Sequence, residues 1–283
     1  MYRTTRGLAT SGLVLALALA LAGCRQEAEV PGGTAGPDAS AMPAAADTAA
    51  AAPVALEDVM ETDPRYIVGI SYPPGMDRYP GLAAELRRYA DAARADLMEA
   101  VEAHDPAEGG ERIPYDLTLA YDVLMETPTI VAVQAWGTLY TGGAHGNPLV
   151  ARFVWLPQRK EMLRAEKLVA GEDGWREVSA FVRESLHAAL SQRLDADDVA
   201  PADRVKLMRS GSEMIDDGTG SLAENFGQFE PLPGEGGRLR GLRFVFPPYQ
   251  VGPYSDGMQT VEVPASVLLP HLAPEYRDLF AAG

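Results

Sequence analysis

His145 is the residue of this sequence best suited to acid–base chemistry, because an imidazole can take up or release a proton near neutral pH. It lies in a glycine-rich stretch from Tyr140 to Asn147, YTGGAHGN, which follows an expected strand. It could serve as a general base if Asp256, Tyr249 or Tyr254 came close to it in the fold.

The same stretch has a structural explanation, which we favour. Gly142, Gly143 and Gly146 permit a tight turn with positive φ, and His145 would hydrogen-bond to hold that turn in place. No acid adjoins His145 in the sequence to orient it. We therefore assign no catalytic residue and treat His145 as part of a candidate ligand-binding site.

The other chemically active side chains form no catalytic or metal motif. His104, His187 and His271 are isolated from one another and never stand at metal-ligand spacing, and His187 is interpreted as a surface residue of a helix. No GxSxG, P-loop or HExxH motif occurs. Asp216-Asp217-Gly218 lacks the alternating acidic ligands of a calcium loop and is interpreted as a turn. We expect neither a metal nor a cofactor.

Two tyrosines form the second candidate site. Tyr249 and Tyr254 lie in PPYQVGPY, a connection rich in proline and glycine. Aromatic rings on a loop are good anchors for a protein or a sugar ring, although at least one of these two is expected to pack against a sheet edge. Trp136 and Trp155 lie on expected strands and are interpreted as core residues. The candidate ligand-binding residues are Tyr140, His145, Asn147, Tyr249, Tyr254 and Asp256.

Hydrophobic patterning predicts the elements that position these residues. Tyr66 to Tyr72 alternates between prolines, which predicts a strand, and apolar residues from Leu82 to Val101 recur at helical spacing. Strands are also predicted at 115–125, 129–140 and 150–156. Short connections between the neighbouring strands favour antiparallel pairing.

The second half repeats these ingredients. Trp175 to Leu194 predicts an amphipathic helix, and a short helix is predicted from Ala202 to Met208. Strands are predicted at 225–229, 239–246 and 259–263, followed by a short helix from Ser266 to Leu272. The expected fold class is α+β, with antiparallel sheets each packed by an amphipathic helix. We expect two small subdomains, 56–160 and 161–283.

The N-terminus predicts export and lipid attachment. Arg3 and Arg6 precede an apolar run, Leu13 to Leu21, that is shorter than the roughly 20 residues of a membrane span. The run ends in Leu21-Ala22-Gly23-Cys24, which resembles the lipobox of bacterial lipoproteins, whose cysteine is acylated, for example with palmitate. Residues 1–23 are therefore predicted to be a signal peptide and Cys24 the lipidation site. By the same resemblance, Arg25 favours the outer membrane, facing the periplasm.

Composition limits the partners. The formal charge is −16, and removing residues 1–23 would take away two arginines and no acid. A strongly acidic protein repels phosphate backbones, so we exclude nucleic acid, whereas a cationic partner would be attracted. The common alternative is an acidic surface that only keeps the protein soluble. Residues 24–55 contain almost no large apolar side chains and predict a disordered tether.

Two segments resemble a known extracytoplasmic module. They are Tyr140 to Asn147 and Phe244 to Val263, FVFPPYQVGPYSDGMQTVEV, in this order around the helix near Trp175. The module is found in the lysozyme-sensing anti-sigma factor RsiV, in the peptidoglycan deacetylase PdaC and in many lipoproteins. The resemblance covers nearly all of residues 60–280. It implies an extracytoplasmic α/β module without catalysis of its own.

The departures from this resemblance matter equally. RsiV-type proteins have a sigma-binding segment and a membrane span before the module, whereas only a short segment precedes the apolar run here. PdaC-type proteins add a deacetylase domain, which we do not expect in this protein. Three hypotheses follow: a non-catalytic module that binds a lysozyme-like hydrolase or cell-wall glycan, a peptidoglycan hydrolase centred on His145, and a structural envelope lipoprotein. We favour the first.

Overall fold

The computed structural model describes residues 55–103 and 113–281, which all belong to one compact unit, Gly36–Gly283. The predictions made for the signal peptide, for Cys24, for the tether before Ala55 and for His104 lie outside the described residues.

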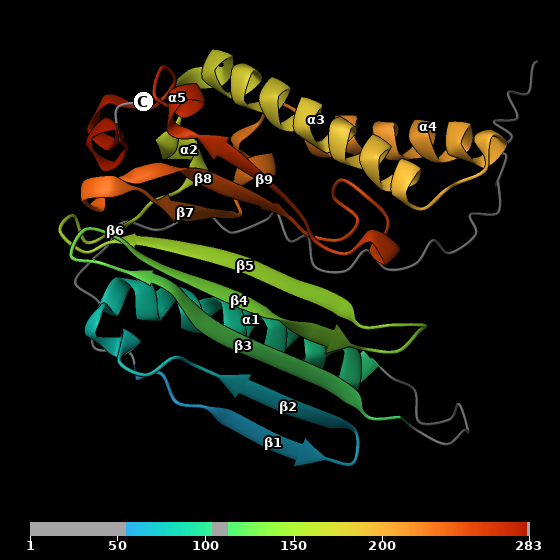
Figure 1. The fold of residues 1–283 in the computed structure, drawn as a ribbon. Coiled ribbons are helices and arrows are strands. Elements are labelled where there is room, and N and C mark those ends of the chain that lie inside the picture. The colour runs from blue at the N-terminus through green and yellow to red at the C-terminus, as the bar shows by residue number, and fades with distance from the viewer. Residues whose placement is uncertain (1–54, 104–112, 282–283) are drawn as a thin grey trace, which may run out of the picture. The chain divides into compact units, whose positions relative to one another are not determined.

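A six-stranded sheet forms the first layer (Figure 1). Its spatial order follows the chain: β1 Val59–Asp63, β2 Tyr66–Ser71, β3 Tyr115–Glu126, β4 Val131–Tyr140, β5 Asn147–Leu156 and β6 Glu161–Met162. Neighbouring strands are antiparallel except β2 and β3, which are parallel because helix α1, Pro80–Ala103, connects them.

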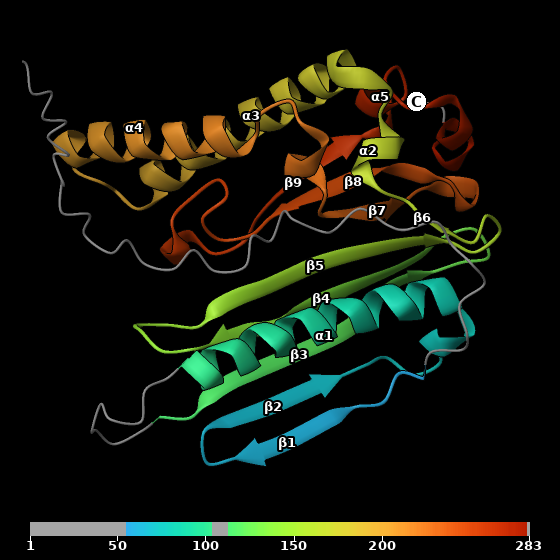
Figure 2. The ribbon, with the colours of Figure 1, turned by 180° about the vertical axis from the view of Figure 1, so that it is seen from behind.

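Helix α1 covers one face of this sheet, as Figure 2 shows from behind. Its apolar residues recur every three or four positions, so they form one stripe, and they are buried against alternate residues of the strands. The stripe includes Leu82, Leu86 and Leu97, and β3 contributes Leu117 and Leu119. The opposite face of β1–β4 has no helix over it in the described part of the chain (Figure 1).

A three-stranded antiparallel sheet forms the second layer, with β7 Phe229–Pro233, β8 Leu239–Phe246 and β9 Gln259–Pro264 in that order. Helix α3, Gly171–Ala196, covers it, and α4, Pro201–Gly218, packs beside α3. The short helices are α2 Ala165–Leu168 and α5 Ala265–Leu268, with 3-10 turns η1 Met76–Arg78, η2 Ala223–Phe226, η3 Glu235–Gly237, η4 Tyr254–Asp256 and η5 Pro274–Leu279. The predicted α+β class, with a helix on each sheet, is confirmed.

Strand β5 lies between the two hydrophobic cores. Phe153 and Trp155 point into the core beneath α1, whereas Val154 and Leu156 join the core beneath α3. Strand β5 also contacts β7, so both of its faces are buried. The predicted boundary at residue 160 falls between β5 and β6, which pair in one sheet.

Several predictions differ from the structure in detail. Residues 225–229 do not form the predicted strand: a 3-10 turn places Phe226 between Trp175 and Phe244, and β7 begins only at Phe229. Helix α4 extends beyond the predicted end at Met208 to Gly218, and Ile215 is its one buried residue. It also includes Asp216-Asp217-Gly218 as its last turn. Strand β1 was not predicted.

The core assignment was correct for Trp155 and wrong for Trp136. Trp155 is 5% exposed, but Trp136 is 54% exposed. Along β4, the odd-numbered positions Val133, Ala135 and Leu139 face α1 and are buried. Because side chains alternate along a strand, Trp136 must point to the opposite, uncovered face.

Candidate functional site

The two candidate segments meet in the fold, although about a hundred residues separate them. His145 lies in the turn between β4 and β5, where Gly142 and Gly143 both have positive φ. Tyr249 and Tyr254 lie in the connection from β8 to β9. We call His145, Tyr249 and Tyr254 the aromatic cluster.

The aromatic cluster has a defined geometry. The imidazole of His145 stacks on the ring of Tyr254, with centroids 3.9 Å apart and an angle of 9° between the planes. The Tyr249 hydroxyl lies 3.1 Å from His145 Nε2, and the rings of the two tyrosines are 5.8 Å apart. One histidine therefore joins both tyrosines.

The hydrogen bonds of His145 define its tautomer. Its Nδ1 lies 3.2 Å from the carbonyl oxygen of Gly146, which can only accept, so Nδ1 carries the proton in the neutral ring. Nε2 then has a lone pair that accepts the hydrogen of the Tyr249 hydroxyl. Both nitrogens are thus engaged, as expected for a histidine that orders a turn.

The aromatic cluster lies at the surface. Tyr249 is 53% exposed and Tyr254 is 37% exposed, and His145 is also exposed. The expectation that one of the tyrosines packs away with its hydroxyl bonded holds only in part: Tyr249 is bonded but remains exposed. Exposed rings held in fixed positions offer a large contact area at low entropic cost.

Hydrogen bonds to α4 and η2 anchor the β8–β9 connection. Strand β8 stops where Pro247 and Pro248 remove backbone donors. Gln250 then donates from Nε2 to the carbonyl oxygens of Gly218, at 3.0 Å, and Asn225, at 2.9 Å. Gly218 allows this approach, because a Cβ there would lie 1.9 Å from the Gln250 carbonyl oxygen.

Tyr249 has a strained backbone conformation. Its φ is +75°, in the left-handed region, and its amide donates to the Gly252 carbonyl at 2.9 Å. A bulky residue in this region costs of the order of 1–3 kcal/mol, and such strain gathers at functional sites. The fold thus holds a tyrosine where an asparagine or glycine would be relaxed.

The structure does not join every candidate residue to the aromatic cluster. The carboxylate of Asp256 points to helix α3, where its Oδ2 pairs with Arg193 Nη2 at 2.6 Å. Tyr140 donates to the Gly143 carbonyl at 3.3 Å and so braces the turn that holds His145. Asn147 is the first residue of β5 and pairs with Leu139. Asp256 is therefore not placed to orient His145 for base catalysis.

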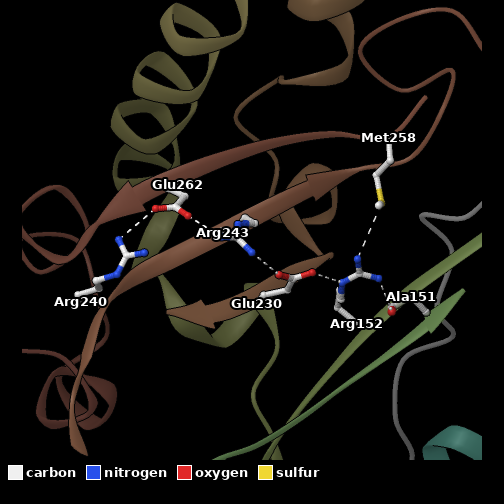
Figure 3. A network of polar contacts seen from close by, with 7 residues as sticks. All are labelled: Ala151, Arg152, Glu230, Arg240, Arg243, Met258 and Glu262. Carbon is white, nitrogen blue, oxygen red and sulfur yellow. Dashed lines mark hydrogen bonds and ion pairs between the residues drawn. The ribbon is translucent and has the colours of Figure 1, made fainter. Parts of the chain in front are cut away.

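A buried ionic network that the sequence did not reveal links the two sheets (Figure 3). Arg152 on β5 donates from Nε to Glu230 on β7 at 2.7 Å, and its side chain is only 3% exposed. Glu230 also pairs with Arg243 on β8 at 3.1 Å, and Arg243 pairs with Glu262 on β9. The only signal in the sequence was a charged residue inside the apolar run ARFVWL.

The ion pairs of Arg243 and Glu262, at the outer end of this network, shift the pKa values of both residues. Hydrogen bonds from Arg243 and then Arg240 lower the pKa of Glu262, and the bond to Glu262 raises the pKa of Arg243. Both residues are therefore charged at neutral pH. Since the network joins β5 to all three strands of the second sheet, it positions the β8–β9 connection relative to the β4–β5 turn.

A serine, a histidine and an aspartate also meet between α3 and α4. Ser212 Oγ lies 3.3 Å from His187 Nδ1, and Asp216 Oδ1 lies 3.2 Å from His187 Nε2. A catalytic serine, histidine and aspartate also need backbone N–H groups beside the serine to stabilise the oxyanion that forms during hydrolysis. Ser212 lies inside α4, where the backbone N–H groups bond within the helix. We therefore interpret the contacts among Ser212, His187 and Asp216 as structural contacts that join α3 to α4.

A cavity of about 400 Å³ lies beside α1 and β1. Two arginines in its wall pair with carboxylates, Arg94 with Glu61 at 2.9 Å and Arg87 with Asp91 at 3.8 Å. The wall also contains Glu57 and Asp58. Burial, followed by the charge of Asp91, raises the pKa of Tyr72 in its wall to about 12. The cavity wall therefore contains more carboxylates than arginines.

The residues described contain no group of three or more histidine, cysteine, aspartate or glutamate side chains placed to hold a metal ion. Within the same ranges, none of the helices is both long and apolar enough to span a bilayer.

A family model matches the segment that carries two of the three rings of the aromatic cluster. Residues 239–266, which contain β8, the connection with both tyrosines, and β9, match the model of DUF3298, described as a protein of unknown function. No curated protein matches the chain.

Solved structures to which the chain is similar include two proteins of the DUF3298 family. One is a DUF3298 family protein from Pseudomonas aeruginosa PAO1, with 16% identity, 82% of this chain and 99% of that chain covered, and a TM-score of 0.50. The other is a member of the same family from Bacteroides fragilis NCTC 9343, with 16% identity, 78% and 93% covered, and a TM-score of 0.44. The chain thus contains a segment that matches the DUF3298 model and shares its fold with the Pseudomonas protein of that family.

Proposed function

We propose that this protein is a non-catalytic binding protein of the bacterial cell envelope, whose aromatic cluster recognises its partner. The observation on which this rests is the convergence of His145, Tyr249 and Tyr254, from two distant segments, into exposed and fixed rings. Clustered tyrosines are typical of residues that dominate binding energy at interfaces.

The proposed partner is a cationic protein, such as a lysozyme-like hydrolase. The net charge of −16 attracts such a protein over a distance of about one Debye length, roughly 8 Å at physiological salt. The resemblance to the module of RsiV, which senses lysozyme, supports the same choice. Cell-wall glycan is the alternative ligand, and the experiment below separates the two.

Two features favour binding over hydrolysis at His145. Both of its ring nitrogens are engaged, and Asp256, the acid that the sequence offered as its partner, is paired with Arg193. A general base needs a free nitrogen within reach of the substrate proton. We therefore expect His145→Ala to abolish no enzymatic activity on peptidoglycan, and detection of a hydrolytic activity that depends on His145 would contradict the proposal.

We further propose that Cys24 is lipidated after removal of residues 1–23 and holds the protein to a membrane, with the outer membrane favoured. More than one acyl chain is needed for stable anchoring. Cys24→Ala should move the protein from the membrane fraction to the soluble fraction. Mass spectrometry of the N-terminal peptide checks the acylation directly.

The partner is tested with the full-length chain, purified in non-ionic detergent, against a c-type lysozyme and against insoluble peptidoglycan, each at low and moderate salt. We expect saturable binding to lysozyme that weakens as salt rises. Binding to peptidoglycan alone would make the protein a wall-binding module. Failure of both would contradict the proposed ligand classes.

A further inference from the structure

Trp136 is the most unusual exposed side chain of the six-stranded sheet. It lies on the uncovered face of β4 and is 54% exposed, whereas Trp155 and Trp175 are 5% and 4% exposed. Leaving a tryptophan in water forgoes the stabilisation of burying a large apolar ring. The ring is nevertheless held in place, because its Nε1 donates to Asp122 Oδ2 at 2.7 Å.

The residues around Trp136 on β3 and β4 form a mostly polar floor. Across the strands, Trp136 is opposite Ala120, and the next pair along the same face is Thr118 with Thr138. On the other side, Asp122 is opposite Gln134, whose Nε2 also donates to Asp122 Oδ2, at 3.2 Å. Side chains two residues apart on a strand are roughly 6.6 Å apart, so hydroxyl and amide groups lie on either side of the ring.

We infer that this face is a saccharide-binding platform, on which a neutral pyranose ring stacks on Trp136 and its hydroxyls bond to Asp122 and Gln134 or to Thr118 and Thr138. The apolar C–H groups of a pyranose match the indole face, and the carboxylate and amide offer acceptors and donors to hydroxyls. The bonds that Asp122 already accepts fix its carboxylate and leave lone pairs for a sugar hydroxyl.

The composition of this floor favours a sugar over other ligands. A protein interface needs a contiguous apolar centre. On β5, Trp136 is opposite Val150, which is buried, and Thr138 is opposite Pro148. The exposed neighbours of the ring are polar, namely Thr118, Asp122 and Thr138. A polyanion would meet Asp122 and an acidic protein. A neutral chain of pyranoses needs no large apolar centre and is not repelled by the negative charge. The aromatic cluster lies beyond the C-terminal end of β4, in the β4–β5 turn and the β8–β9 connection, and shares no residue with this floor.

The exposure pattern provides a direct assay. Of the three tryptophans, only Trp136 is open to a neutral quencher such as acrylamide. We predict that a hexamer of β-1,4-linked glucose or of β-1,4-linked N-acetylglucosamine protects the full-length chain from acrylamide quenching in a saturable manner. Isothermal titration gives the affinity independently.

Two variants test the location of the platform. Trp136→Ala removes the stacking surface, and Thr138→Lys places a long side chain over the floor without touching the tryptophan. We expect each to weaken hexamer binding about tenfold or more, with thermal unfolding unchanged. Tyr254→Ala should bind the hexamer as the wild type does, which separates this site from the aromatic cluster.

The results that overturn the inference are equally definite. The platform is excluded if neither hexamer protects Trp136 and neither binds by titration. It is also excluded if Trp136→Ala and Thr138→Lys bind a hexamer as tightly as the wild type. Loss of lysozyme binding, with sugar binding absent, in Trp136→Ala would identify the face as a protein interface instead.

Discussion

At the scale of single residues, the left-handed backbone of Tyr249 lowers the stability of the fold while it holds an aromatic ring at the surface. Tyr249→Asn should relieve this strain, because asparagine adopts positive φ more readily. We expect the free energy of unfolding to stay unchanged or to rise by up to about 1 kcal/mol, while binding of the cationic partner weakens. Urea unfolding and a binding titration measure the two quantities.

Tyr249→Phe is the matched control, because it keeps the ring and the strain but removes the hydroxyl bonded to His145. Its binding should fall less than that of Tyr249→Asn. If Tyr249→Asn lost more than about 1 kcal/mol of stability, the ring would be a structural element and not a binding one.

The sequence contained a signal that Trp136 is exposed, but the hydrophobicity of tryptophan obscured it. A tryptophan on a strand suggests a core, yet Gln134 and Thr138, which share its face, are polar. Alternation along β4 therefore indicated the exposed face correctly, whereas hydrophobicity alone did not. By contrast, no local pattern showed that Asp256 would pair with Arg193, because that contact depends on how α3 crosses the second sheet.

At the scale of elements, the sequence was most informative where periodicity was strong. Helices α1 and α3 and strands β3 and β4 each bury one main face, and their predicted positions, like that of β8, agree with the structure to within a few residues. The short β1 and the 3-10 turn before β7 were not recognised. Their conformation depends on partners distant in sequence, since β1 pairs with β2 and Phe226 inserts between Trp175 and Phe244.

The contact between α4 and the β8–β9 connection should control the aromatic cluster. Gly218→Ala would place a Cβ 1.9 Å from the Gln250 carbonyl oxygen, so the connection must shift. We expect a loss of about 1–3 kcal/mol in stability and weaker partner binding. Gly69→Ala, where nothing lies within 4 Å of the added Cβ, is the control and should bind normally. Equal binding by both variants would contradict the claim that Gly218 positions the cluster.

The link between the sheets should depend on Arg152. Arg152→Met leaves Glu230, whose side chain is 12% exposed, with Arg243 as its remaining partner in Figure 3. Removing one member of a buried pair is costly, and we expect a loss of about 2–4 kcal/mol in urea unfolding.

Arg240→Met is the matched control for Arg152→Met. Arg240 belongs to the same network, but its side chain is 55% exposed, so its loss should cost less than about 1 kcal/mol. Similar losses in both variants would show that burial of Arg152 does not distinguish it from the surface arginines.

At the scale of the whole molecule, several carboxylates make stability depend on acidity. Hydrogen bonds from Tyr79 and then Arg78 lower the pKa of Glu126, and those from Arg243 and then Arg240 lower the pKa of Glu262. A carboxylate whose pKa is lower in the folded state stabilises the fold above its unfolded pKa. That contribution is lost as pH falls through the folded value.

We therefore expect the Tm to fall as pH decreases below about 5. The double variant Glu126→Gln, Glu262→Gln should have a lower Tm at neutral pH and a shallower decline towards acid. Calorimetry across pH measures both profiles. Parallel profiles would show that these two carboxylates do not contribute to the acid sensitivity.

The central claim is that the aromatic cluster is the binding surface for a cationic protein, and the affinity of Tyr254→Ala tests it most directly. Titration of the full-length chain with c-type lysozyme at low salt compares the wild type, Tyr254→Ala and Leu207→Ala, a matched loss of an exposed apolar side chain on α4. Our account predicts that Tyr254→Ala raises the Kd by about tenfold or more while Leu207→Ala leaves it unchanged. A wild type that binds saturably, with Tyr254→Ala binding equally well, would contradict it.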